Sequence, residues 1–339
     1  MPRVTVLMPV FNAAPFLEES IRSVLGQTLR ELELIVVNDG STDESGRIAR
    51  DLAATDRRVL YLEQSNQGAS AARNHGLAIA RADYIAAADA DDIQLPQRLA
   101  RQVAFLDRRP DISVCGGWLE PFGANAGPVC RYPTDDARLR CQLLFDCPIA
   151  HPTVMFRREV MARHQLLYRA EFTVAHDYDL WVRAASHCQF ANLPEVLVRY
   201  RQHAAQLTSR HRDDRVRTET RQLWALQLGR LGLTCTPDDL AVHERLSFWQ
   251  TRFVPEEVEA AGDWLARVMA ANAKTGVYPA PEFARTLGRR WHWVCANAVG
   301  LGPGTYRRFR GSPLAAAAGL TTYELGRFWL KCRLRRSAG

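Results

Sequence analysis

The stretch "VTVLMPVFNAAPFLEESIRSVL", residues 4–25, decides the expected fold because two hydrophobic periods meet within it. Residues 4–10 form a continuous apolar run of strand-forming residues, which is typical of a strand buried on both faces. From residue 14 onward the apolar side chains recur at helical spacing instead: Phe16, Leu17, Ile21, Val24 and Leu25. A buried strand followed by an amphipathic helix is the repeating unit of a parallel sheet covered by helices.

The same alternation continues to about residue 110. Further strands are expected at 32–38, 59–64 and 83–89, and helices are expected within 39–53, 65–81 and 95–110. Strands that alternate with helices of this length predict the α/β fold class, with a mostly parallel, Rossmann-like sheet flanked by helices.

The pattern is less regular from residue 111 to 205, with strands expected at 112–120, 151–158 and 195–203 and a helix at 175–186. Beyond about residue 210 the spacing becomes mainly helical. We therefore expect a first domain over residues 1–209 and a helical region over 210–339, which would serve acceptor, membrane-surface or oligomer contacts.

Charge is distributed unevenly along the chain. Residues 1–205 carry 23 basic and 25 acidic side chains, a net of −2, whereas residues 206–339 carry 21 and 12, a net of +9. The basic excess therefore belongs to the C-terminal part. Eight cysteines are scattered without a C-x-x-C pair, which favours free thiols in a reducing compartment over zinc ligands or disulfides.

The N-terminal apolar run of about eight residues is too short for a signal peptide, and no segment of about 20 apolar residues exists to cross a membrane. We expect a cytoplasmic protein, with peripheral attachment at the inner face of the cell membrane through residues 312–336. This segment combines apolar residues with five cations, Arg327, Lys331, Arg333, Arg335 and Arg336. Such a helix fits an anionic membrane surface, but a helix packed on its own domain with a solvated basic face explains the pattern equally. No nucleic-acid recognition motif is present, so no nucleic-acid partner is expected.

Polar side chains follow three of the expected strands, in "PVFN" (9–12), "NDGSTD" (38–43) and "DADD" (89–92). Ligands of parallel sheets bind at the carboxyl ends of the strands, so these loops predict one site. The D-x-D pair Asp89 and Asp91 suits a hard divalent cation that also binds phosphate and water, although a solvated loop of capping aspartates is the alternative. Asp92 is expected to cap the following helix.

Other candidates have two interpretations each. Asp39 can accept a hydrogen bond from a base or ribose, or belong to a turn. Arg73 can balance a phosphate or the acidic cluster, or lie on the surface. Asp177, at the start of a helix, can act as a general base, or cap that helix. His203 after a strand-like run is either functional or a satisfied surface residue.

The order of these blocks is more specific than any one of them. Residues 3–209 resemble the family 2 glycosyltransferases, inverting enzymes with the GT-A fold, in "VTVLMPVFN", "ELIVVNDGSTDES", "NQGASAARNHG", "YIAAADADD", "HDYDLWVRA" and "YRQHAAQLT". A dehydrogenase is not expected, because no G-x-G-x-x-G follows the first strand.

The resemblance implies roles for individual residues. It places Pro9, Val10, Asn12, Asp39, Arg73 and Asp89 at the nucleotide, with Asp39 reading the base (usually uracil) and Asp89 near the ribose. It implies Asp91 as the metal ligand and Asp177 as the catalytic base, and it brings His203 to the metal or the diphosphate. His176 stands where the family has Glu, and Phe11 where Tyr is commoner.

The resemblance also implies the reaction. A sugar would move from a nucleotide-diphosphate donor, with UDP as the implied nucleotide, to a hydroxyl of a glycan or lipid-linked glycan, with Mn²⁺ or Mg²⁺ as cofactor. Inversion would give a β-glycosidic bond, in the assembly of cell-surface polysaccharide or lipopolysaccharide. The alternative is a catalytically inactive module that binds sugar nucleotides.

Overall fold

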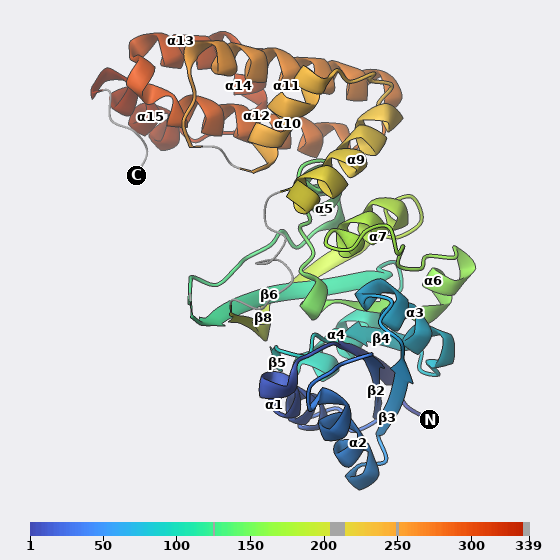
Figure 1. Cartoon of the computed structure of the whole chain (residues 1–339). Helices are drawn as coiled ribbons and strands as arrows, with labels where there is room; N and C mark the ends of the chain where they lie inside the picture. The colour runs from blue at the N-terminus through green and yellow to red at the C-terminus, as the bar shows by residue number, and fades with distance from the viewer. Residues whose placement is uncertain (125, 204–213, 249–250, 335–339) are drawn as a thin grey trace. The chain divides into compact units, whose positions relative to one another are not determined.

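An eight-stranded sheet frames the N-terminal part of the chain in the computed structural model (Figure 1). The structure describes residues 1–124, 126–203, 214–248 and 251–334. In sheet order the strands are β3 (Val59–Gln64), β2 (Leu32–Asp39), β1 (Val4–Val10), β4 (Tyr84–Ala87), β7 (Met155–Arg157), β6 (Val114–Gly123), β8 (Phe190–Gln202) and β5 (Ile93–Gln94). Strands β1 to β4 pair in parallel, which confirms the expected α/β class.

The first half of the sheet follows the hydrophobic pattern closely. All eight residues of β2 are buried, and β1 is buried except at Pro9, as expected for strands covered on both faces. The helices that follow the strands are α1 (Ala14–Leu25), α2 (Ser45–Thr55), α3 (Ala69–Ile79) and α4 (Arg98–Arg108). In α1 the side chains of Leu17, Ile21 and Val24 are buried at the expected helical spacing. These elements align the ends of β1 and β2 at one edge, where Val10 lies beside Asn38.

The second half of the sheet departs from the simple alternation. Strand β7 pairs antiparallel with both β4 and β6, while the long strand β8 runs parallel to β6. The segment expected as a strand at 151–158 begins as a 3-10 turn, His151–Thr153, and only Met155–Arg157 pairs. Pro152 explains the difference because it has no N–H to donate to a sheet. Further helices are α5 (Asp136–Leu143), α6 (Arg158–Arg163) and α7 (His176–Ala184).

A two-residue strand, β5, occupies part of the segment after the acidic loop, and it was not expected from the sequence. It pairs antiparallel with β8, Ile93 opposite Arg199, and α4 begins only at Arg98 rather than near Leu95. This pairing brings the acidic loop next to the end of β8, residues that are far apart in the sequence.

The chain divides into two compact units. The first comprises Met1–Leu139 and Cys147–Glu219, and the second Arg140–Asp146 and Thr220–Gly339. The expected boundary between 209 and 210 lies outside the described residues. The second unit is thus not one continuous stretch, because it includes the short segment Arg140–Asp146 from the middle of the sequence.

The second unit is built from helices, as expected for the C-terminal region. These are the later residues of α9 (Asp214–Arg230), then α10 (Pro237–Ser247), α11 (Pro255–Thr275), α12 (Ala280–Asn297), α13 (Pro303–Gly311), α14 (Pro313–Ala317) and α15 (Thr322–Leu334). Its interior is rich in fully buried aromatic side chains: Trp224, Phe283, Trp291 and Phe309. No helix in the described ranges is long and apolar enough to cross a membrane.

Candidate active site

The loops after β1 and β2 are hydrogen-bonded to each other. Pro9 and Val10 end β1, and Asn12 follows with a left-handed backbone, φ 50°. The Asn12 amide donates to Ser41 Oγ at 3.0 Å, and its side-chain Oδ1 accepts from the Thr42 amide at 2.9 Å. Two of the three expected loops thus form one exposed rim at the carboxyl edge of the sheet.

Asp39, the last residue of β2, is 2% exposed, and its carboxylate is occupied by protein donors. Oδ1 accepts from Gln64 Nε2 at 2.8 Å and from the Gln67 amide at 2.9 Å, and Oδ2 accepts from the Gly68 amide at 2.8 Å. The next residue, Gly40, has φ +70°, and a Cβ there would lie 2.8 Å from the Asn66 backbone nitrogen. Asp39 therefore holds the loop before α3 close to the end of β2.

Arg73 connects two candidate regions. From α3 its guanidinium donates to Asp89 Oδ1 at 2.9 Å and contacts His176 Nε2 at 2.9 Å, and it lies over the ring of Tyr168 at 5.6 Å. Only 5% of Arg73 is exposed. The surface interpretation of Arg73 is therefore wrong: this side chain is a buried bridge between the D-x-D loop and the start of α7.

His176 is held in one neutral form by this bridge. Arginine can only donate, so Nε2 of His176 must accept, and the ring proton lies on Nδ1, 3.4 Å from the Thr173 carbonyl. Burial, and then the charge of Arg73, lower the pKa of His176 to about 3. His176 thus contributes a neutral dipole at a position where the family resemblance implied a glutamate charge.

Asp91 is paired with His203 across the loop. Its Oδ2 lies 2.9 Å from His203 Nε2, and the imidazole ring packs against Phe16 with ring centroids 4.6 Å apart. Burial, and then the neighbouring charge of Asp89, raise the pKa of Asp91, although the hydrogen bond with His203 opposes the shift. The structure therefore brings together the two side chains that the sequence suggested for a metal.

Asp92 does not cap a helix, so that expectation is wrong. It is fully buried, and its Oδ1 accepts from the backbone amide of Arg201 in β8 at 2.9 Å. Burial, and then the charges of Asp89 and Asp91, raise the pKa of Asp92 well above its ordinary value. The reason is the unexpected strand β5, which turns the loop toward β8 before the helix begins.

The donor atoms at Asp91 and His203 fit a divalent cation. A carboxylate oxygen and an imidazole nitrogen, already 2.9 Å apart, can bind one ion once the proton between them is lost. Within the described ranges, no three His, Cys, Asp or Glu side chains are grouped so that they alone could hold a metal ion. A cation here would thus need further oxygen ligands from phosphate or water, as Mg²⁺ commonly does.

Asp177 lies in the first turn of α7, next to His176. It is partly exposed, and its Oδ2 lies 3.9 Å from the Cys147 thiol while Oδ1 accepts from the Tyr178 amide at 2.7 Å. Burial raises the pKa of Asp177 to about 6, more than the nearby positive charge of Arg73 lowers it. A carboxylate with this pKa, partly open to solvent, can take a proton near neutral pH.

Three residues at this site were not predicted. Tyr168 and His151 form a buried pair, with His151 Nε2 3.0 Å from the tyrosine hydroxyl, and Glu219 of α9 binds the backbone before α7. None belongs to a motif. His151 stands beside Pro152 in a segment that looked like a strand, and Glu219 lies in a helix of ordinary composition, so the sequence carried no signal for them.

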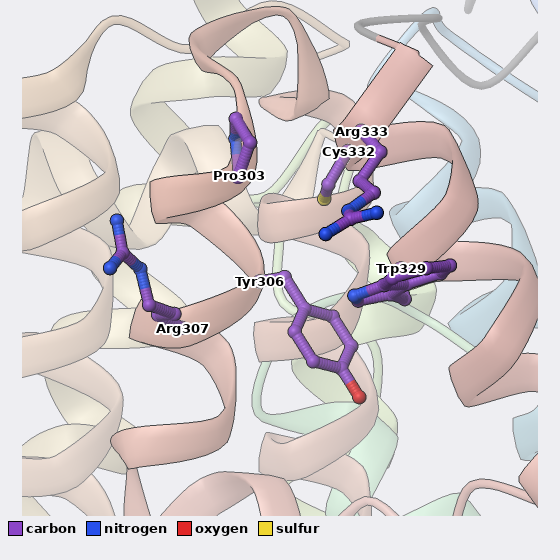
Figure 2. Close-up of a pocket in the computed structure, with 6 residues that line it drawn as sticks. All are labelled: Pro303, Tyr306, Arg307, Trp329, Cys332 and Arg333. Atoms are coloured by element: carbon purple, nitrogen blue, oxygen red, sulfur yellow. The ribbon is translucent and has the colours of Figure 1, made fainter.

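The second unit contains a hollow of about 160 Å³ between α13 and α15. None of the site residues predicted from the sequence lines it. Figure 2 shows Tyr306, Trp329 and Arg333 around it, with Arg307 pointing away. The Arg333 guanidinium lies 4.6 Å from the ring centre of Trp329. Since it lacks the predicted site residues, we assign this hollow no part in the reaction.

Comparison with known proteins finds a matching family and several relatives. The model of glycosyl transferase family 2 matches residues 5–164. An uncharacterized glycosyltransferase of Haemophilus influenzae is 32% identical over 219 residues, which is 61% of this chain and 68% of that protein. The uncharacterized glycosyltransferase EpsJ of Bacillus subtilis is 32% identical over 220 residues, 61% of this chain and 63% of its own length. These relatives are thus matched over about two thirds of their lengths.

Solved structures share the fold over more of the chain. TarS 1–349 of S. aureus in complex with UDP-GlcNAc superposes with a TM-score of 0.60 at 16% identity, covering 88% of each chain. The mannosyltransferase PcManGT of Pyrobaculum calidifontis, in complex with GDP-Man and Mn²⁺, has a TM-score of 0.55 at 19% identity, covering 98% of this chain and 87% of its own. At these identities the likeness concerns the fold, and it confirms the expected GT-A architecture.

Proposed function

The chain belongs to glycosyltransferase family 2, and from that premise we propose that it transfers a sugar from a nucleoside diphosphate donor to an acceptor hydroxyl with inversion. One observation carries the proposal. The Asp89–Arg73–His176 bridge joins the D-x-D loop to the first turn of α7, where Asp177 has a pKa of about 6. A base suited to neutral pH is thereby linked to a strand-end acidic loop.

The donor would bind at the carboxyl edge of the sheet. Pro9, Val10 and Asn12 would border the nucleotide, and Asp39 would support the base side through the loop that it fixes. Arg73 and Asp89 would contact the ribose and diphosphate side. The neighbours solved with UDP-GlcNAc and with GDP-Man support a nucleotide sugar, and we propose UDP as the nucleotide.

Asp91 and His203 would hold Mn²⁺ or Mg²⁺, because their oxygen and nitrogen donors are the kinds that such ions accept. When bound, the ion would neutralise the charge that develops on the leaving diphosphate. The neighbour solved with Mn²⁺ supports a divalent cation as cofactor.

Asp177 would act as the general base. As the acceptor oxygen forms its bond to the anomeric carbon, the carboxylate takes the hydroxyl proton, and the bond from that carbon to the diphosphate oxygen breaks with its electron pair leaving on the diphosphate. His176 is neutral, and its Nε2 already accepts a hydrogen bond from Arg73. Of these two neighbouring residues, Asp177 is therefore the one that can take a proton. A single displacement on an α-linked donor gives a β-linked product, and we propose that this product enters cell-surface polysaccharide or lipopolysaccharide.

The test has two stages. Purified protein is first screened with a panel of UDP- and GDP-sugars for thermal stabilisation in the presence and absence of Mn²⁺, since a ligand that binds the folded state raises Tm. The best donor is then assayed for diphosphate release, and the anomeric configuration of the product is read by NMR. A β-linked product made by wild type and not by Asp177→Asn supports the proposal, whereas an α-linked product would contradict inversion.

The competing function is an inactive module that binds sugar nucleotides. Stabilisation by a donor, with neither transfer nor hydrolysis over a wide acceptor panel, would favour that module. The retention of Asp91 with His203 and of Asp177 favours the enzyme, because a module that only binds donor has no use for a base with a raised pKa.

The outward face of α15 leads us to propose peripheral contact with an anionic membrane that carries the acceptor. Phe328 and Cys332 are buried in the second unit, whereas Tyr323, Leu330 and Leu334 are 76%, 50% and 53% exposed. At 3.6 residues per turn these three share one face. Exposed apolar residues flanked by cations are typical of helices at a lipid interface. The cations in the described part of the helix are Arg327, Lys331 and Arg333, and the expected Arg335 and Arg336 lie outside it.

Sedimentation with vesicles of phosphatidylcholine, with and without phosphatidylglycerol, tests this contact. The variant Leu330→Ser with Leu334→Ser should lose binding to the anionic vesicles. The matched control is Leu301→Ser, another exposed leucine of the second unit at 43%. Equal binding by the double variant and the control would rule out α15 as the contact.

A further inference from the structure

Glu219 of α9 has an unusual set of partners, all in the segment that precedes α7. Its Oε1 accepts from the Thr173 amide at 3.0 Å and from Thr173 Oγ1 at 2.9 Å. Its Oε2 accepts from the amides of Val174 at 2.9 Å and Ala175 at 2.8 Å. One carboxylate from a helix more than 40 residues later therefore satisfies three successive backbone amides.

We propose that Glu219 is a positioning residue for Asp177, which rests on the proposed function of Asp177 as the base. Helix α7 begins at His176, and its N-cap, Ala175, has no side chain that can accept a hydrogen bond. Glu219 instead binds the amides of the N-cap residue and of the two residues before it, and it places a negative charge near the positive end of the helix dipole. Asp177 is only two residues beyond the last amide that Glu219 binds.

The carboxylate of Glu219 is well suited to this task. It is 5% exposed, and although burial alone raises the pKa of Glu219, the amides of Ala175, Thr173 and Val174 lower it by more. Glu219 therefore stays ionised at neutral pH, with Arg215 one turn earlier at 3.5 Å. Charge-assisted hydrogen bonds of this kind are stronger than neutral ones and fix geometry more tightly.

The other end of the same segment is fixed by α3. Asn74 Nδ2 donates to the Tyr168 carbonyl at 2.7 Å, and the Tyr168 amide donates to Asn74 Oδ1 at 3.0 Å. Residues 168–175 thus enter α7 between two anchors, Asn74 and Glu219. Without Glu219, the backbone next to Asp177 would be free to move. The hydrogen bonds of Asn74 with Tyr168 and of Arg73 with Asp89 would remain.

The test separates positioning from plain stabilisation. Glu219→Gln keeps the shape but leaves one acceptor oxygen, and Glu219→Ala removes both. The matched control is Glu324→Gln: Glu324 likewise accepts from a threonine amide and hydroxyl, those of Thr321 at 2.7 and 2.9 Å, at the start of α15. We measure kcat, donor KM, Tm and amide hydrogen exchange of residues 172–180 in the full chain.

We expect kcat to fall about 10-fold in Glu219→Gln and about 100-fold in Glu219→Ala, because small displacements of a catalytic group cost rate steeply, while donor KM stays within about 2-fold. Exchange of the amides at 173–175 should rise. Glu324→Gln should lower Tm by less than Glu219→Gln, because Glu324 is more exposed, and it should leave kcat unchanged. If Glu219→Ala folds and keeps wild-type kcat, or if Glu219→Gln and Glu324→Gln lose equal rate, the positioning role is wrong. Absence of transfer by the wild type would overturn the proposed function instead.

Discussion

The two ends of the candidate site use aspartates in opposite ways. At the Asp39 end, one buried carboxylate accepts three hydrogen bonds, two of them from backbone amides, and so fixes a loop. At the Asp91 end, Asp89, Asp91 and Asp92 are crowded within four residues, and the pKa values of Asp91 and Asp92 are raised by burial and by their neighbours. A carboxylate whose oxygens accept from amides maintains structure, whereas the crowding around Asp91 would be relieved by the cation that we propose there. Aspartates that hold a loop in place can thus be told apart from aspartates proposed to act on the ligand by the partners of their carboxylates.

The largest expected effect is on turnover. Asp177→Asn should reduce kcat by about 10³-fold or more, because the amide cannot take the acceptor proton. Asp39→Asn in the same assay should act mainly on donor KM. Steady-state kinetics at saturating donor compare the two. Equal losses of kcat would break the distinction between a supporting and a reacting carboxylate.

The second largest effect is expected on the affinity for Mn²⁺, which should depend on the Asp91 end of the site and not on the Asp39 end. His203→Ala removes the nitrogen ligand beside Asp91, so the affinity for Mn²⁺ in the presence of UDP should fall about 10- to 100-fold. Isothermal titration calorimetry measures this affinity. Gln64→Ala, which removes a side-chain donor to Asp39, is the control and should leave it unchanged. A similar loss in the control would place metal binding elsewhere.

Replacing an aspartate by asparagine should lower the free energy of unfolding at the Asp39 end and leave it unchanged or raise it at the Asp91 end. Asp39→Asn leaves buried backbone donors facing an amide, so we expect the free energy of unfolding to fall by about 2 kcal/mol. Asp91→Asn without metal removes repulsion from Asp89 and Asp92 and should change this free energy by about 0 to +1 kcal/mol. Urea unfolding in the presence of EDTA measures both. A loss of 2 kcal/mol in each variant would contradict the comparison.

The smallest effect concerns the pH dependence of stability. The pKa of Asp177 is about 6 in the folded state against an ordinary 3.8, so between these values the unfolded chain releases its proton first and the wild type loses stability as pH rises. Asp177→Asn does not titrate. It should be more stable than wild type by about 1 kcal/mol at pH 7.5, an amount reduced for its partial exposure, and equal to it near pH 4. Urea unfolding at both pH values would disprove this if the variant were less stable at pH 7.5.

The sequence predicted the elements whose signal is local. Strand β1 and helix α1 follow from hydrophobic periodicity, and the loops at the strand ends follow from where polar residues interrupt it. Strand β5 could not be predicted, because two residues carry no period and their pairing depends on β8, about 100 residues later. For the same reason the expected cap at Asp92 was wrong.

Site residues divide in the same way. Asp91 and Asp177 are marked by motifs, and His203 by the resemblance. Their partners are not: Arg73 was open to a surface interpretation, and Glu219 lies outside the matching blocks. Which charges pair in a folded chain depends on tertiary contacts that a single sequence does not specify.

The second, helical unit contains a peptide from the middle of the sequence, Arg140–Asp146, and this limits where the chain can be cut into fragments. The backbone of residues 143–146 lies within that unit: the Phe145 carbonyl accepts from Trp224 Nε1 at 3.1 Å, the Leu144 carbonyl from His243, and Asp146 pairs with Arg290. A fragment cut at residue 220 would lack this peptide and leave three buried polar groups unsatisfied. The helical unit therefore needs a peptide from the middle of the sequence to complete its core, and cutting the chain at residue 220 would not yield the intact unit.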